Sequence, residues 1–185
     1  LDLATGLIGS NDVIDVASDA SVSGMAVGSL GADATSTASG ATANAGKDDS
    51  AVGAVLPDLN VGGIANITGA AQLDTSATAS NVGSDSNDAN ANAGLGQTVT
   101  GLDAVAIDVA SDASLTAQGF SNLDASATST GGIASADAGN ADSLVTVLAE
   151  GLTLYIGGIG NLAASAQGTA DASASSVTGS TDASA

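Results

Sequence analysis

The sequence predicts an all-β protein, built either as a tandem-repeat β-solenoid or as an elongated β-sandwich, with strands rich in Ala, Ser, Thr and Gly. Small apolar residues alternate with Asp, Ser or Thr in stretches such as ADATSTA and ASATST. A two-residue alternation places one set of side chains on each face of a strand. The single Lys, with no Arg, rules out the charged pairs that stabilise exposed helices, and 25 Gly interrupt the chain.

A long-range repeat is the second observation behind this fold class. The octapeptide IDVASDAS occurs at 14–21 and again at 107–114, and the similarity continues without a gap well beyond it. A weaker similarity between 72–80 and 122–130 indicates a further repeat inside each half. We therefore expect four related units of about 40 to 50 residues, a spacing typical of repeat architectures.

Three segments follow from the repeat. Residues 13–104 form the first β repeat unit, and residues 105–185 form a second, truncated unit. The part that the second unit lacks corresponds in position to residues 1–12. We therefore expect the N-terminal segment of one chain to complete a neighbouring subunit.

The alternation slips by one residue at the same place in both copies, between Gly40 and Ala41 and again between Ile133 and Ala134. A one-residue slip moves every later side chain to the other face of the strand. It therefore indicates a bulge or a corner at which the chain bends or passes to another sheet. A solenoid that turns a corner and a sandwich with kinked strands both fit.

Composition excludes several classes of function. Asp+Glu number 20 against one basic residue, and the formal net charge of -19 makes nucleic acid and anionic membranes poor partners. His and Cys are absent, which removes the usual general base and the thiolate metal ligands. Because Lys47 is the only amine available to activate a Ser nucleophile, we expect no enzyme. No apolar run approaches the ~20 residues of a membrane span, so we expect no membrane insertion.

Calcium is the one cofactor that the sequence suggests. Asp15 and Asp19 lie four residues apart and are expected on one face of a strand, with Asp108 and Asp112 as their counterparts. Stacked in register, these like charges repel unless a cation or a hydrogen-bond donor intervenes. Oxygen ligands without His or Cys suit calcium, so these four residues are the predicted metal ligands. The alternative is that they are solvated and protect strand edges.

The Ala, Ser, Thr, Gly and Asn alternations and the tandem IDVASDAS units resemble secreted repetitive extracellular fibre and matrix proteins of prokaryotes, the class of functional amyloids and β-solenoid surface filaments. The resemblance implies a structural subunit of an extracellular or cell-surface filament without an active site. Small side chains let sheets approach closely, and open strand edges accept another chain. A head-to-tail interface between identical copies then produces a filament.

Other interpretations of the sequence remain open. Residue 1 is Leu and the only Met is Met25, which favours secretion after removal of a signal peptide. The tripeptide NIT at 66–68 is an acceptor sequence for a glycan or a chance match on a turn. Two alternative functions are a monomeric β-solenoid that binds ice through flat Thr, Ser and Ala faces, and a spacer within a large adhesin.

Overall fold

The computed structural model describes residues 2–3, 13–46, 50–56, 58–83, 87–94, 96–139, 144–148 and 151–185. These residues form strands and turns without a helix, and all of their strand pairs are parallel. The predicted all-β class is confirmed. Parallel pairing selects the solenoid, because β-sandwiches are built from antiparallel sheets.

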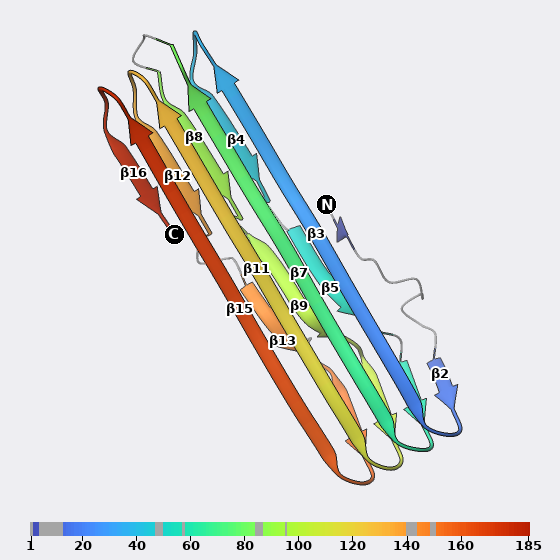
Figure 1. The fold of residues 1–185 in the computed structure, drawn as a ribbon. Helices are drawn as coiled ribbons and strands as arrows, with labels where there is room; N and C mark the ends of the chain where they lie inside the picture. Colours follow the sequence, from blue (N-terminus) through green and yellow to red (C-terminus); the bar gives the residue numbers. More distant parts are fainter. Residues whose placement is uncertain are drawn as a thin grey trace.

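The chain winds through four rungs that stack along the solenoid axis (Figure 1). Rung 1 contains β2 (Val13–Val16), β3 (Ala20–Ser36), β4 (Ala41–Ala45) and β5 (Ser50–Val55). Rung 2 contains β6 (Asp58–Val61), β7 (Ala65–Asn81), β8 (Ala89–Ala93) and β9 (Gln97–Asp103). Rung 3 contains β10 (Ala106–Val109), β11 (Ala113–Ser129), β12 (Ala134–Ala138) and β13 (Leu144–Leu148). Rung 4 contains β14 (Thr153–Ile156), β15 (Gly160–Ser176) and β16 (Thr181–Ser184), while β1 (Asp2–Leu3) precedes rung 1.

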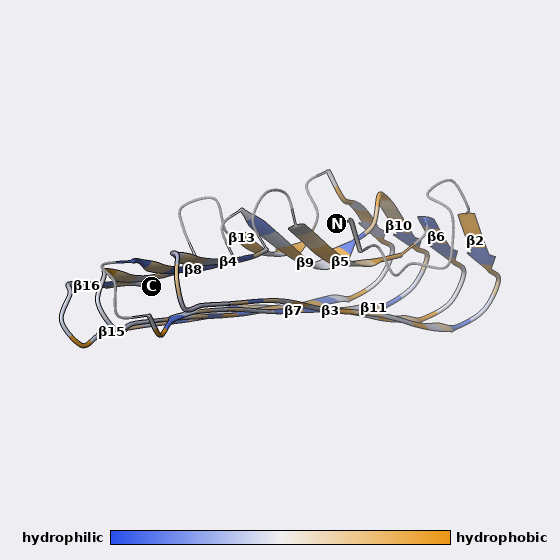
Figure 2. Cartoon of the chain, turned by 90° about the horizontal axis from the view of Figure 1, so that it is seen from above, coloured by the Kyte–Doolittle hydropathy of each residue, from blue (hydrophilic) through white to orange (hydrophobic). Residues whose placement is uncertain are grey.

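Equivalent strands of successive rungs pair into four sheets. Sheet A has the order β1-β5-β9-β13, sheet B β2-β6-β10-β14, sheet C β3-β7-β11-β15 and sheet D β4-β8-β12-β16. The 17-residue strands of sheet C form one layer, and the short strands of sheets D, A and B succeed one another along the opposite layer (Figure 2). The predicted phase slip is the corner at which the chain passes from sheet C to sheet D, between Ser129 and Ala134 in rung 3.

The core between the two layers differs from one end of sheet C to the other. Where sheet D faces sheet C, the buried apolar residues are Ala in every case except Leu123. Where sheet B faces sheet C, the core contains Leu, Ile and Val, such as Leu59, Ile67 and Leu115. Figure 2 shows the layers closer together at the sheet D end, as expected when most of the side chains between them are methyl groups.

Residues that pair across the rungs form columns, and the columns explain the repeat in the sequence. Ile14 pairs with Leu59, Leu59 with Ile107, and Ile107 with Leu154. The two IDVASDAS phrases therefore lie in rungs 1 and 3, with rung 2 between them. The predicted boundary between residues 104 and 105 lies between the end of β9 and the start of β10, so each repeat unit supplies two rungs.

The strand pairing in sheet C differs by two residues from the sequence similarity inside each half. The similarity between 72–80 and 122–130 implies an offset of 50 residues, but sheet C pairs Gln72 with Phe120 and Asp74 with Asn122. The register therefore differs by two residues. A shift of two keeps every side chain on the same face of the strand, so the alternation alone does not distinguish the two registers.

Candidate functional site

The predicted metal ligands Asp15 and Asp108 lie in one column on the outer face of sheet B. They are not neighbours, because Asn60 lies between them in register. The Asn60 amide donates a hydrogen bond from Nδ2 to Asp15 Oδ1 at 2.8 Å. The direct alignment of like charges that the sequence suggested is therefore avoided by a hydrogen-bond donor in the intervening rung.

Asp19 and Asp112 occupy turns, which corrects the expectation that they share a strand face with Asp15 and Asp108. The preceding strand ends at Val16 in rung 1, and the turn to sheet C begins directly after it. Each carboxylate accepts a hydrogen bond at Oδ1 from a backbone N–H of the next rung, Ile64 N for Asp19 and Ile159 N for Asp112, both at 2.8 Å. These side chains hold one turn onto the next.

Two other Asp side chains also accept hydrogen bonds from backbone N–H groups of the next rung. Asp58 Oδ1 accepts from Ala106 N at 3.0 Å, and Asp88 Oδ1 accepts from Ile133 N at 2.9 Å. In all of these pairs the donor lies one rung further along the solenoid. A carboxylate that accepts from a turn N–H satisfies a backbone donor that lies outside the strand ladders.

The structure does not bring the predicted calcium ligands together. Within the described ranges there is no group of three or more His, Cys, Asp or Glu side chains that would hold a metal ion. Calcium binding by Asp15, Asp19, Asp108 and Asp112 stays a prediction.

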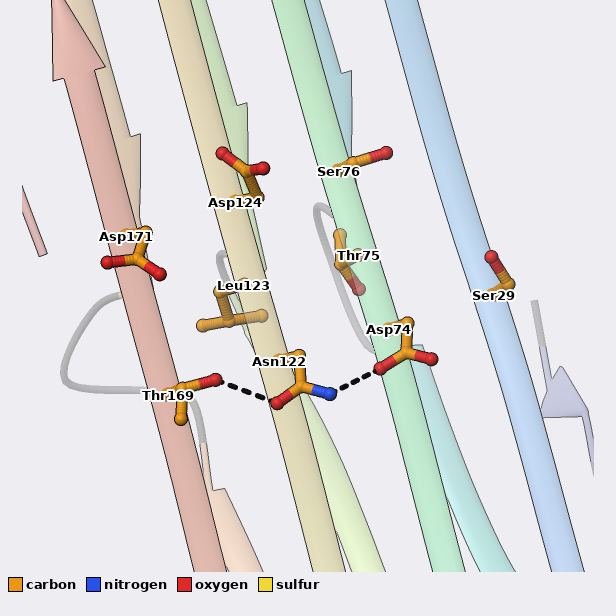
Figure 3. A pocket seen from close by; sticks show the side chains of 9 residues that line it. All are labelled: Ser29, Asp74, Thr75, Ser76, Asn122, Leu123, Asp124, Thr169 and Asp171. Atoms are coloured by element: carbon orange, nitrogen blue, oxygen red, sulfur yellow. Dashed lines mark hydrogen bonds between the residues drawn. The ribbon is translucent and has the colours of Figure 1, made fainter.

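The outer face of sheet C carries a polar hollow of about 320 Å³, lined by side chains from all four rungs (Figure 3). Asn122 Nδ2 donates to Asp74 Oδ1 at 2.6 Å, and Thr169 Oγ1 donates to Asn122 Oδ1 at 2.7 Å. Beside this chain of hydrogen bonds, Asp124 lies directly opposite Asp171. These polar groups bond to one another across successive rungs and so connect the strands of sheet C.

A regular Thr surface is not formed by sheet C. Thr35, Ser80, Thr128 and Ser175 make one complete column of hydroxyls. Other outward columns of the same sheet contain Asp side chains and bulky groups, including Phe120. This mixture lacks the fixed Thr spacing on which the ice-binding interpretation depends.

The open strand edges expected from the sequence lie at the two ends of the solenoid. We name the free edges of β2, β3 and β4 the head face and the free edges of β14, β15 and β16 the tail face. Leu162 on the tail face is 58% exposed, whereas Ile67 and Leu115 in the same column are 1% and 2% exposed. The tail face therefore presents core positions to solvent.

The tail face is also hollowed. A cavity of about 150 Å³ lies between β13 and β15, lined by Gln97, Ser121, Leu123, Leu144, Val145, Gly168, Thr169 and Ala170. Gln97 is 1% exposed, and its Oε1 is the only buried side-chain polar atom in the described parts of the chain that has no hydrogen-bond partner. The small side chains of Gly168 and Ala170 leave this space beside sheet A.

Comparison with known proteins gives no relative: no protein-family model, no curated protein and no solved structure matches the chain. The described residues include no helix of the length and apolar character needed to cross a membrane. The case for a function therefore rests on the solenoid and its two end faces.

Proposed function

We propose that this protein is the structural subunit of an extracellular or cell-surface filament, in which copies assemble head to tail by β-strand pairing. The observation that carries the proposal is the pair of open ends: the tail face and the head face are edges of the same parallel sheets. An edge strand presents unpaired N–H and C=O groups, which form a template for another strand. The exposed Leu162 adds apolar area that such pairing would bury.

Strand direction determines how copies join. Because all described pairs within the sheets are parallel, the same pairing continues only when the tail of one copy meets the head of the next. An interface between two different faces of identical subunits repeats without closing when the rotation per subunit does not form a ring. A straight stack of this kind is a filament.

Sheet A favours the same polarity. β1 pairs with β5 and so lies one strand beyond rung 1, while β13 is the last described strand at the opposite edge. Head-to-tail stacking places β1 of one copy beside β13 of the preceding copy. This arrangement agrees with the expected role of the N-terminal segment, of which the structure describes residues 2–3.

Charge makes assembly dependent on ionic strength. Each copy carries a formal charge of -19, so copies repel at low salt. The Debye length falls from ~30 Å at 0.01 M to ~8 Å at 0.15 M, which screens most of this repulsion. Calcium would act more strongly than a monovalent salt if it bridged carboxylates. The extracellular location follows from the resemblance of the repeats to secreted fibre proteins.

Negative-stain electron microscopy tests the proposal. The purified chain is imaged in dilute buffer, at physiological ionic strength, and with millimolar calcium before and after chelation. We expect separate particles in dilute buffer and unbranched filaments once charge is screened. Separate particles under every condition, with a β-type circular dichroism spectrum, would refute the filament proposal. Loss of filaments on chelation at constant ionic strength would implicate the carboxylates.

Proline provides a blocking variant. The N–H groups of Ala20, Ala65 and Ala113, each at the start of its sheet C strand, all donate to the following rung. Gly160 holds this position in rung 4, so the N–H of Ala166, an even number of residues later on β15, points out of the tail face. Ala166→Pro removes that donor and leaves the pairing with β11, so we expect folded chains that do not form filaments.

A further inference from the structure

We infer that the junction between copies has one defined register, in which rung 4 of one copy is followed by rung 1 of the next with Gly160 opposite Ala20. This inference rests on the proposed filament and specifies its partner as a second copy of the same chain. The register is that of the columns inside the molecule, in which Ala20, Ala65, Ala113 and Gly160 pair in sequence.

The turns between sheets B and C support this junction. Rungs 1 and 3 carry Ala-Ser-Asp at this turn, at 17–19 and 110–112, while rungs 2 and 4 carry Gly-Gly-Ile, at 62–64 and 157–159. The two turn types therefore alternate with a period of two rungs. Four rungs contain two full periods, so placing rung 1 after rung 4 continues the alternation without a fault.

The second residue of a turn must be glycine when the preceding rung carries an Ala-Ser-Asp turn. A Cβ on Gly63 would collide with Asp19 Oδ1, and a Cβ on Gly158 would collide with Asp112 Oδ1. An Ala-Ser-Asp turn that followed another turn of its own type would bring a Ser side chain to this crowded position. The order of turn types therefore disfavours stacking rung 3 or rung 1 directly before rung 1.

The molecule already contains the contact that the junction needs. Rung 2, with its Gly-Gly-Ile turn, is followed by rung 3, with its Ala-Ser-Asp turn. At this step Ala110 N donates to Val61 O at 2.8 Å, and Ala65 N donates to Asp112 O at 3.0 Å. At the junction, the equivalent hydrogen bonds run from Ala17 N of the following copy to Ile156 O, and from Gly160 N to Asp19 O of the following copy.

A column of polar side chains at the corner between sheets C and D gives independent support. The last residue of each long strand bonds to the turn of the rung before it: Asn81 Nδ2 donates to Ser39 O at 3.1 Å, and Ser176 Oγ donates to Gly132 O at 2.8 Å. Ser129 Oγ likewise donates to Asn87 O, at 3.1 Å. Ser36 is the first residue of this column. In the junction register it lies beside the turn of the preceding copy that contains Gly179.

Core columns also match across the junction. The column of Ala32, Ala77, Ala125 and Ala172 consists of one residue type, so the Ala layer continues unchanged from Ala172 to the next Ala32. In the same register Leu30 lies beside Ala170, at the cavity between β13 and β15. A larger side chain of the incoming copy therefore meets the place where the tail face is hollow.

Charges at the junction avoid one another. In this register Asp171 on the outer face of sheet C faces Gly31, and Asp33 faces Ser173. Inside the molecule, by contrast, Asp124 directly faces Asp171. The junction therefore has no pair of like charges opposite each other in sheet C, so the charge repulsion that opposes it comes from the net charge of the two copies.

Paired cysteine substitutions test the register, because the chain has no native Cys. Thr35→Cys with Ser175→Cys places two thiols opposite each other at the junction, and Ser29→Cys with Thr169→Cys does so at a second column. Within one chain the members of each pair are three rungs apart, about 14 Å, so an intramolecular disulfide does not form. The matched control is Ser29→Cys with Ser175→Cys, whose thiols lie about 20 Å apart along the strands in the inferred register.

Each variant is assembled at physiological ionic strength, oxidised or treated with a short bis-maleimide, denatured and separated by size, with filaments counted in parallel by electron microscopy. We expect a ladder of covalent multimers from both in-register pairs and almost none from the control. Filaments whose control pair crosslinks better, or that give dimers from Ser175→Cys alone, would overturn the register while leaving the filament in place. Absence of both filaments and crosslinks in all variants would overturn the filament itself.

Discussion

Rung 3 and rung 4 have closely similar strands, yet one is buried and the other is exposed. Leu115 in β11 is 2% exposed, and its column partner Leu162 in β15 is 58% exposed. Both side chains point toward the same core. Rung 3 has a neighbour on each side, whereas rung 4 has one neighbour and no described strand in sheet A. In a solenoid, a rung buries its apolar positions through its neighbours as much as through the facing layer.

The largest expected effect is the contrast between these two leucines. Leu115→Ala should lower the free energy of unfolding by about 2 to 5 kcal/mol, because it leaves a cavity in the Leu, Ile and Val half of the core. Leu162→Ala should change it by less than about 0.5 kcal/mol in separate chains, as for exposed positions. Urea denaturation in dilute buffer measures both. Equal losses would show that rung 4 is covered within a single chain.

Leu162→Ala is also expected to affect assembly. If the tail face is buried between copies, Leu162→Ala should raise the critical concentration for filament formation at physiological ionic strength. Sedimentation of filaments over a dilution series measures it. An unchanged critical concentration would place Leu162 outside the junction.

Turn glycines provide the second contrast. Gly63→Ala should cost about 1 to 3 kcal/mol, because the added Cβ meets Asp19 and the backbone of Ser18. Gly168→Ala, on the exposed strand β15, has no atom within 4 Å of the added Cβ and should change stability by at most about 1 kcal/mol, in the stabilising direction. Thermal unfolding in dilute buffer measures the pair. A neutral Gly63→Ala would remove the steric basis for the alternating turns.

The Ala layer gives a third matched pair. Ala136 in β12 is fully buried, and its column partner Ala183 in β16 is exposed. Ala136→Val adds two methyl groups between closely packed sheets and should cost about 1 to 3 kcal/mol. Ala183→Val should stay within about 0.5 kcal/mol in separate chains. Similar tolerance at both positions, measured by urea denaturation, would indicate that the Ala layer has spare volume.

The smallest effect concerns the contact between rungs 3 and 4. Asp112→Ala removes the acceptor for Ile159 N and should cost about 1 kcal/mol. Asp112→Asn keeps an acceptor and should recover most of that loss. Hydrogen exchange at the Ile159 amide is the direct readout, with faster exchange in the Ala variant than in the Asn variant. Equal exchange rates in both variants would argue against the turn-holding role of this carboxylate.

Much of the fold was predictable because solenoid strands obey a strict two-residue alternation. The alternation gave the strands, the 93-residue repeat gave pairs of rungs, and the slip before Ala41 and Ala134 marked the corner between sheets C and D. The alternation does not determine the register: the sequence similarity at Gln72 lies two residues from the observed pairing, and a shift of two preserves both faces. Turn packing and the corner hydrogen bonds fix the register, and they depend on contacts between rungs.

The candidate sites were less predictable. The sequence predicted Asp15 and Asp19 on one strand face, because the Ala-Ser-Asp segment resembles the polar alternation of the strands. In the structure the strand ends at Val16, and the turn that follows separates the two residues. The position of Asn60 between the two Asp residues could not be predicted, because rung 2 does not contain the IDVASDAS phrase. The two end faces had no local signal, because Leu162 differs from Leu115 only in what lies beside it.

Electron cryomicroscopy of filaments formed at physiological ionic strength tests end-to-end stacking most directly, through the axial rise per subunit. Four rungs at a strand spacing of about 4.8 Å give a rise of about 19 Å, with strands perpendicular to the filament axis and all subunits pointing the same way. A density map with this rise and an unbroken sheet C across subunits is the expected result. A different rise, alternating subunit polarity, or a gap in sheet C between subunits would contradict the stacking of rung 4 on rung 1.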